Sequence, residues 1–194
     1  MPSSTEILET RRCNLQAERD ACKTQVERNK LGQFATPTRL ARDIVAFGLS
    51  LLPEDQGIRF LDPAIGTGAF YSALRATKAK RELIWARGFE IDPHYGKPAQ
   101  ELWAKDPLTI SLSDFTAQQK PDSARDRANL LICNPPYVRH HHIAPVDKAR
   151  LQCLARSASW NLSGLAGLYC YFIALAHKWM SDGGIRSEER RVGK

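Results

Sequence analysis

Hydrophobic positions follow two periods along the chain, and their order predicts strands that alternate with helices. Short apolar runs between turn-forming residues predict buried strands at 58–62, 83–90, 108–112 and 129–133. Apolar residues at helical spacing predict helices at 38–52, 69–77 and 165–180, and a weaker one at 98–103. Thr36 or Thr38 is expected to cap the first of these helices. This order of elements indicates an α/β fold with a parallel sheet.

The two ends of the chain depart from this pattern. Residues 5–31 have few apolar positions among charges of both signs, so we expect a solvated helical arm over residues 1–31, ahead of a domain covering 32–185. A buried fifth strand is expected after Gly184, but residues 186–194 read RSEERRVGK, which is too polar to be buried. We therefore predict an incomplete sheet of four strands, an unpaired edge on strand 129–133, and a tail that is not native sequence.

Composition narrows the function classes. The 194 residues suffice for one domain with a sizeable core. The formal net charge of +7 favours a polyanionic partner such as nucleic acid, although many proteins without such a partner are as basic. Five cysteines without a CxxC pair argue against a zinc cage or a disulfide framework and favour a cytoplasmic location. No apolar run approaches the ~18 residues of a membrane span, and no signal peptide is recognisable.

Unusual residues follow each predicted strand. The segments are Asp62–Gly68, Glu90–Pro93, Ser113–Phe115 and Asn134–Tyr137. In parallel sheets, ligands bind at the carboxyl ends of the strands, near the point where the strand order reverses. We therefore expect these four segments to form one site.

The first three segments together favour a cofactor that contains adenosine. The Gly66-Thr67-Gly68 turn lets the backbone approach a ligand closely, and Glu90 can accept both ribose hydroxyls. Asp114 can accept from an adenine amino group, with Phe115 or Ile91 against the ring. Glu90 or Asp114 alone would fit a solvated strand end equally well. The third glycine of a dinucleotide fingerprint is missing, which argues against nicotinamide.

The fourth segment, Asn134-Pro135-Pro136-Tyr137, is the most specific signal in the chain. Two consecutive prolines fix the backbone directly after a buried strand. The Asn134 side-chain oxygen and the Pro135 carbonyl can then accept from one NH2 group, while Tyr137 stacks on a planar base. The structural alternative is a Pro-Pro loop with a buried tyrosine.

Taken together, these motifs resemble those of the S-adenosylmethionine-dependent adenine-N6 DNA methyltransferases. The matching segments are Gln33–Pro37, Asp62–Phe70, Gly88–Pro93 and Asn134–Arg139. Their order, with the QFATP element ahead of the glycine turn, resembles the gamma class, which includes many restriction–modification enzymes. The likeness extends over residues 28–185. Ile65 stands where the family has Cys or Gly, and we expect it to be tolerated because it points away from the ligand.

This resemblance implies a class I, Rossmann-like methyltransferase fold and a role for each motif. The catalytic residues that hold a flipped adenine of double-stranded DNA are expected to be Asn134, Pro135 and Tyr137. The resemblance also assigns residues to each part of S-adenosylmethionine. The methionine side is lined by Phe34, Thr36 and Pro37, and the amino-acid part is surrounded by Asp62, Ala64, Gly66 and Gly68. Glu90 holds the ribose, the adenine lies among Ile91, Asp114 and Phe115, and Pro136 abuts the cofactor. A cognate restriction endonuclease is a further implied partner. The family has seven strands and a target-recognition domain, so we expect little or no turnover from the 194-residue form.

Other interpretations stay open at this point. NPPY also occurs in methyltransferases that act on RNA bases or on protein glutamine amides, and a fragment that binds cofactor or DNA without catalysis is another alternative. Cys133 is predicted to be a core residue, not the nucleophile of a cytosine-C5 methyltransferase. His140–His142 are not expected to bind a metal, because no acidic or cysteine partner is close in sequence. Phosphate contact or a solvated face fits the basic residues of 138–160 almost equally well; these are Arg139, Lys148, Arg150 and Arg156.

Overall fold

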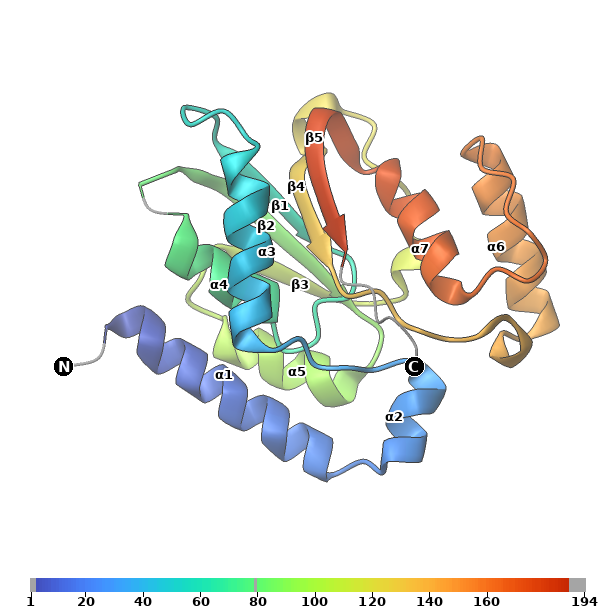
Figure 1. Ribbon diagram of the computed structural model, residues 1–194, viewed down its shortest axis with the longest axis horizontal. Coiled ribbons are helices and arrows are strands. Elements are labelled where there is room, and N and C mark those ends of the chain that lie inside the picture. The colour runs from blue at the N-terminus through green and yellow to red at the C-terminus, as the bar shows by residue number, and fades with distance from the viewer. Residues whose placement is uncertain (1–2, 79, 189–194) are drawn as a thin grey trace.

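A parallel sheet forms the centre of the fold in the computed structural model, which describes residues 3–78 and 80–188 (Figure 1). In this part of the chain, five strands lie in the order β3-β2-β1-β4-β5, and every neighbouring pair is parallel. The strands are β1 (Ile58–Asp62), β2 (Leu83–Glu90), β3 (Leu108–Leu112), β4 (Ala128–Cys133) and β5 (Met180–Glu188). The predicted α/β fold is confirmed, and the first four strands match their predicted ranges to within one residue.

Side chains of the central strands alternate between two hydrophobic cores. Phe60 and Leu130 face one core, whereas Leu61 and Leu131 face the other, and all four are fully buried. The first core is covered by helices α3 (Thr38–Ser50), α4 (Ala69–Thr77) and α5 (Pro93–Leu102), and the second by α6 (Pro145–Ser157) and α7 (Leu168–His177). Burial on both faces explains why β1 and β4 appear in the sequence as continuous apolar runs. Within the described residues, no helix combines the length and the apolarity needed to cross a bilayer.

The fifth strand contradicts the predicted sheet of four strands. β5 runs beside β4, with Ile185 opposite Leu130 and Arg186 opposite Leu131, so β4 has neighbours on both sides. The predicted helix at 165–180 ends earlier, at His177, and 182–184 lie inside β5 instead of stopping that helix. A strand at the sheet edge pairs through its main chain and exposes part of each side chain, so polar residues are tolerated there. Of the predicted tail, residues 189–194 lie outside the described residues.

The N-terminal segment forms two helices, α1 (Ser4–Ala21) and α2 (Gln25–Leu31), where the sequence predicts one. Thr24 starts the second helix, because its hydroxyl accepts from the Glu27 N–H while the Glu27 carboxylate accepts from the Thr24 N–H. α1 lies along α4 and α5 (Figure 1), and its Glu9 and Arg12 side chains are buried. α1 is therefore packed on the domain, which differs from the predicted solvated arm.

α3 starts at Thr38 as predicted, but its predicted cap is wrong, and the start of α5 differs from the prediction. Pro37 occupies the position before α3, and neither Thr36 nor Thr38 caps that helix, because each hydroxyl bonds to a side chain of another element. α5 begins at Pro93, earlier than the predicted 98, because the Asp92 carboxylate accepts from the His94 N–H and caps the helix. Tertiary bonds thus take the threonine hydroxyls away from the start of α3, and a capping bond starts α5 earlier than its apolar pattern indicates.

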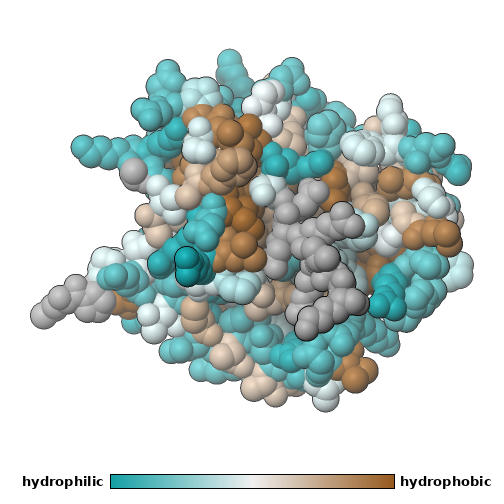
Figure 2. Space-filling view, viewed as in Figure 1, coloured by the Kyte–Doolittle hydropathy of each residue, from teal (hydrophilic) through white to brown (hydrophobic). Residues whose placement is uncertain are grey.

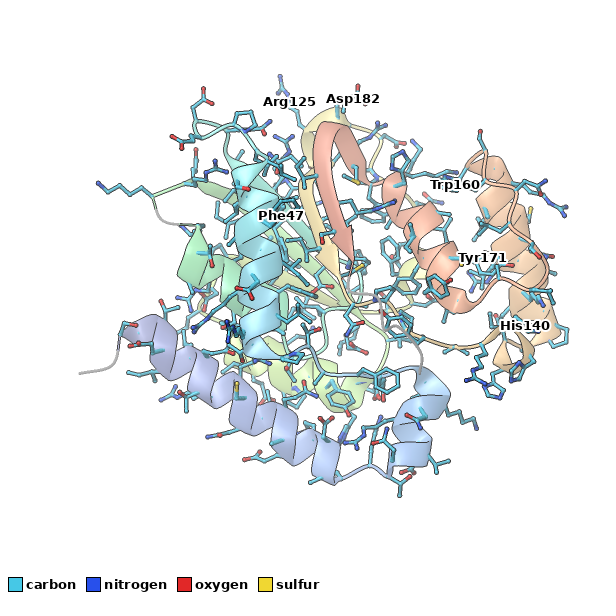
Figure 3. All side chains as sticks on the ribbon, in the orientation of Figure 1. Phe47, Arg125, His140, Trp160, Tyr171 and Asp182 are labelled. Atoms are coloured by element: carbon cyan, nitrogen blue, oxygen red, sulfur yellow. The ribbon has the colours of Figure 1, made fainter. Side chains whose placement is uncertain are left out.

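The outer face of α3 is apolar at the surface. Figure 2 shows a hydrophobic region over this helix, to which Leu40, Phe47 and Leu51 contribute exposed side chains. On the inner side, Val45 and Leu49 are buried in the first core. α3 therefore carries one apolar stripe against the sheet and a second one on the surface, where Phe47 is labelled in Figure 3.

Candidate functional site

A cavity of about 570 Å³ lies at the carboxyl ends of β1, β2 and β4. β1 stands between β2 and β4, where the strand order reverses, which is the usual ligand position in such sheets. The predicted site residues that line the cavity are Phe34, Thr36, Asp62, Ala64, Gly66, Glu90, Ile91, Asp114, Phe115, Asn134 and Pro136. Those that do not line it are Pro37, Gly68, Pro135 and Tyr137.

The two glycines of the turn after β1 serve different purposes. Both have positive φ, 54° at Gly66 and 90° at Gly68. A Cβ atom on Gly66 would meet no atom within 4 Å, whereas one on Gly68 would lie 2.6 Å from Trp103 Nε1. Trp103 Nε1 in turn donates to the Thr67 carbonyl at 3.0 Å. Gly66 therefore leaves its side of the turn open, and Gly68 allows the turn to pack on Trp103.

Gly68→Ala is therefore expected to destabilise the fold more than Gly66→Ala. Both variants force a side chain into left-handed backbone, at a cost of about 1–3 kcal/mol, but only Gly68→Ala adds a steric clash. Urea unfolding of the two variants measures the difference. Equal losses of unfolding free energy would show that the contact with Trp103 does not constrain the turn.

Asp62 at the end of β1 and Glu90 at the end of β2 both line the cavity, Asp62 buried and Glu90 half-buried. Asp62 is 1% exposed; its Oδ1 accepts from the Ala64 N–H at 3.1 Å, and its buried Oδ2 has no partner among the described residues. Burial raises the pKa of Asp62 to about 8, and the charge of Glu90 adds to the rise. Burial also raises the pKa of Glu90, although the Asp92 and Gly66 N–H groups, 2.8 and 3.0 Å away, oppose it. The site therefore holds carboxyl oxygens that can accept from a cationic or hydroxyl-bearing ligand.

The raised pKa of Asp62 makes stability depend on pH. An unfolded Asp carboxyl loses its proton near a pH of about 4, whereas Asp62 in the folded chain keeps it until about 8. Between these values the folded state holds one proton more, so the free energy of unfolding falls as pH rises, by up to about 1.4 kcal/mol per pH unit. Asp62→Asn should remove this contribution. Denaturant unfolding at about pH 5 and about pH 7.5 measures it, and parallel profiles for both proteins would contradict it.

The Asn134 carboxamide is oriented by the segment that precedes α3. Its Nδ2 donates to the Phe34 carbonyl at 3.0 Å and to Thr36 Oγ1 at 3.1 Å. A carbonyl oxygen can only accept, so the amide nitrogen must face Phe34. The Asn134 Oδ1 atom is consequently turned away from both, and it is buried without a hydrogen-bond partner in the described part of the chain. Asn134 thus presents a fixed acceptor in a cavity wall.

Tyr137 lies beside the cavity in a group of aromatic side chains. Its ring centroid is 6.2 Å from that of Phe34 and 6.2 Å from that of Tyr169. Gly32 brings the two segments together, because a Cβ atom there would lie 2.3 Å from the Tyr137 backbone nitrogen. Positive φ at Gly32, 65°, ends α2 and directs the chain across this contact. The structure therefore brings the predicted Phe34 and Tyr137 together, although Tyr137 does not line the cavity.

The residues predicted around an adenine ring differ in solvent exposure and in hydrogen bonding. Ile91 is 65% exposed, whereas Phe115 is almost fully buried in the second core. Asp114 accepts from the Thr116 N–H at 2.8 Å and from Arg150 Nη2 at 3.2 Å. Arg150, which the sequence offers as a phosphate contact, thus lies inside the cavity wall and is bonded to Asp114.

The side chain of Ile65 packs in the first core. Ile65 is 3% exposed, and the residue also borders the cavity. Its Cδ1 atom packs over Gly88 in β2, where an added Cβ atom would lie 2.3 Å away. The larger side chain at this position is accommodated because the neighbouring strand has no side chain there.

The histidine run forms a short turn near the cavity mouth. His140–His142 make one turn of 3-10 helix before α6, where His140 is labelled in Figure 3. His142 lines the cavity. Across residues 3–78 and 80–188, no three His, Cys, Asp or Glu side chains come together as a metal site requires. Cys133 is buried in the second core at the end of β4.

Several cavity residues have no counterpart among the sequence predictions. α1 contributes Gln16 and Asp20, α5 contributes Tyr95, and α7 contributes Leu168 and Phe172. Neither α1 residue lies in a motif, and the polar pattern of α1 carries no sign that it reaches the site. Only the packing of α1 on α4 and α5 brings them there.

Comparison with known proteins relates the chain to methyltransferases. No protein-family model matches it. It is 29% identical over 147 residues to the type II methyltransferase M.XamI of Xanthomonas campestris pv. amaranthicola. The alignment covers 74% of this chain and 26% of that protein. It is 25% identical over 156 residues to M.HincII of Haemophilus influenzae, covering 79% and 26%. The chain thus spans about a quarter of the length of these curated relatives.

Solved structures show the same architecture. The methyltransferase subunit of a type I restriction–modification system from Streptococcus thermophilus superposes with a TM-score of 0.63 at 17% identity, covering 80% of this chain and 34% of the subunit. A Listeria monocytogenes protein described as a class I S-adenosylmethionine-dependent methyltransferase gives 0.63 at 19% identity, covering 89% and 50%. The chain is therefore distantly homologous to restriction–modification DNA methyltransferases, and it has the fold of class I S-adenosylmethionine-dependent methyltransferases.

Proposed function

We propose that this chain carries the cofactor site and the catalytic residues of an adenine-N6 DNA methyltransferase from a restriction–modification system. The observation that carries this proposal is the Asn134 carboxamide, whose amide nitrogen is held by Phe34 and Thr36 while its buried oxygen has no partner among the described residues. A buried acceptor without a partner is costly unless a ligand supplies a donor. The exocyclic amino group of a base is such a donor.

The cavity fits the proposed cofactor, S-adenosylmethionine. Its volume of about 570 Å³ lies within the range of small-molecule sites. The partnerless Asp62 Oδ2 suits the cationic amino-acid part, Glu90 suits the ribose, and the open side of Gly66 leaves room for close backbone approach. Ile91 offers an exposed apolar side chain to a ring. Bound there, the cofactor would supply an electrophilic methyl group on its sulfonium sulfur.

The chain's own residues would prepare the acceptor base. The amino nitrogen of adenine is a poor nucleophile because its lone pair is delocalised into the ring. Accepting both of its hydrogens, at Asn134 Oδ1 and the Pro135 carbonyl, favours a tetrahedral nitrogen and exposes the lone pair. Extruding the base from a duplex costs a few kcal/mol, and stacking on Tyr137 would offset part of that cost.

Double-stranded DNA is the acceptor that the relatives and the charge favour. The aligned proteins include a type II methyltransferase and the methyltransferase subunit of a type I restriction–modification system, so a cognate restriction endonuclease is a further proposed partner. The formal charge of +7 suits a phosphate backbone.

Product analysis tests this function. Because little turnover is expected from this form, the chain is used in excess over its acceptor. It is incubated with methyl-labelled S-adenosylmethionine and plasmid DNA, bulk RNA or a release-factor-like protein, and labelled products are identified after hydrolysis by mass spectrometry. N6-methyladenine from DNA is the expected product. Label in cytosine, RNA or glutamine would overturn the proposed acceptor, and cofactor binding without transfer to any acceptor would favour a binding module.

A further inference from the structure

One wall of the cavity is formed by α1, the polar N-terminal helix. Gln16 and Asp20, one turn apart, both line the cavity. Gln16 Oε1 accepts from Thr67 Oγ1 at 2.8 Å, and Thr67 is the central residue of the glycine turn after β1. On its other side, Gln16 Nε2 donates to Asp20 Oδ1 at 3.0 Å, and the Tyr95 hydroxyl donates to the same oxygen at 2.8 Å. Gln16 is therefore held in place between the glycine turn and α5.

One turn before Gln16, α1 buries an ion pair that touches two segments of the site. Arg12 is 3% exposed and bonds to both carboxylate oxygens of Glu9, at 2.7 and 2.8 Å. Its Nη1 donates to Thr67 Oγ1 at 3.3 Å, and its Nη2 donates to Thr38 Oγ1 at 3.2 Å. Thr38 is the first residue of α3, directly after the segment that contains Phe34 and Thr36. A single guanidinium group thus links the glycine turn to the first residue of α3.

The chemistry of this pair points to positioning more than to stability. A buried ion pair pays a large desolvation penalty and is often no more stabilising than apolar side chains of the same size. The N–H donors of an arginine guanidinium lie in one plane and are directional, so they fix the positions of the groups that they bond to. The groups bonded here are the hydroxyl of Thr67, which lines the cavity, and the hydroxyl of Thr38, which begins α3 just after the cavity residues Phe34 and Thr36.

We propose that α1 is a functional part of the cofactor site, with Arg12 as a positioning residue and Gln16 as a wall residue. Arg12 sets the separation of the glycine turn and the start of α3, and Gln16 fixes the side chain of Thr67 at the cavity surface. This inference rests on the proposed cofactor site. It assigns a binding role to a helix whose sequence pattern indicates only a solvated arm.

Calorimetric titration with S-adenosylhomocysteine tests the proposal on the whole chain. Arg12→Met is expected to weaken binding about 10-fold and Gln16→Ala about 3-fold or more, in proteins that remain folded at the titration temperature. Arg12→Lys, which keeps a charge beside Glu9 but cannot reach both threonines, should fall between the wild type and Arg12→Met. Thermal unfolding is measured for each variant in parallel.

The matched control is Arg81→Met. Arg81 donates to the carbonyls of Leu49 and Leu52 at 3.0 and 2.9 Å, at the far end of α3 from the cavity. This variant should lower the unfolding temperature and leave the affinity unchanged. The proposal is overturned if affinity merely follows unfolding temperature across all the variants, or if Arg12→Met and Gln16→Ala bind as tightly as the wild type. Gln16, which is partly exposed, keeps the test valid if Arg12→Met does not fold. A wild-type chain that binds no S-adenosylhomocysteine would instead overturn the proposed cofactor site itself.

Discussion

Asn134→Ala is expected to slow methyl transfer to adenine by about 10²–10³-fold, while affinity for S-adenosylhomocysteine stays within about 3-fold of the wild type. Asn134 Oδ1 is an acceptor held in position before the base arrives, because the amide nitrogen is already bonded to Phe34 and Thr36. Alanine removes that acceptor without filling the cavity. Single-turnover transfer of labelled methyl groups to DNA measures the rate, and calorimetry measures the affinity.

Asn129→Ala is the matched control for this prediction. Asn129 is a buried asparagine of β4, the strand that Asn134 directly follows, but its amide bonds to the Arg59 N–H and the Gly57 carbonyl, at the opposite end of the sheet. Its replacement should cost stability and leave the transfer rate of the folded protein unchanged. If Asn134→Ala retained the wild-type rate, Asn134 would not be the acceptor of the base amino group.

Glu90→Ala is expected to weaken S-adenosylhomocysteine binding by about 100-fold or more. Each Glu90 oxygen already accepts one backbone N–H, from Gly66 and from Asp92, which leaves lone pairs for two ribose hydroxyls. Alanine would remove both ligand bonds and leave two backbone donors without their acceptor. Glu90→Gln, which keeps one acceptor oxygen, should lose about 10-fold.

Competition with smaller ligands isolates the role of the ribose. Glu90→Ala should weaken the binding of adenosine as a competitor much more than the binding of free adenine, because only adenosine carries the ribose hydroxyls. Equal loss for both competitors would mean that the variant disturbs the whole cavity. Unchanged binding of S-adenosylhomocysteine would remove Glu90 from the cofactor site.

The local pattern of apolar and turn-forming residues is sufficient to predict most of the strands of the sheet and the position of the site. The strands at 58–62, 83–90 and 108–112 are recognisable because burial on both faces demands continuous apolar runs between turn residues. The motif residues follow those strands directly, so a parallel sheet necessarily gathers them at one edge. This is why most of the predicted residues line one cavity.

The failures occur where the partner of a segment is distant in sequence. The polar residues at 186–188 argue against a fifth strand, yet the pairing of β5 with β4 depends on main-chain bonds and tolerates polar side chains at an edge. Thr36 and Thr38 look like helix caps, yet their hydroxyls bond to Asn134 and Arg12, which no local pattern reveals.

The amino-acid sequence alone therefore defines an α/β chain with four strand-end motifs and a resemblance to DNA methyltransferases, because those features depend on neighbours within a few residues. The folded structure adds the orientation of the Asn134 amide, the raised pKa of the buried Asp62, and the wall formed by α1. Each of these depends on groups from separate elements meeting in space: a carbonyl fixes a rotamer, burial excludes water, and a helix packs on two others. The periodicity of apolar residues along a chain contains no information about such contacts between distant segments.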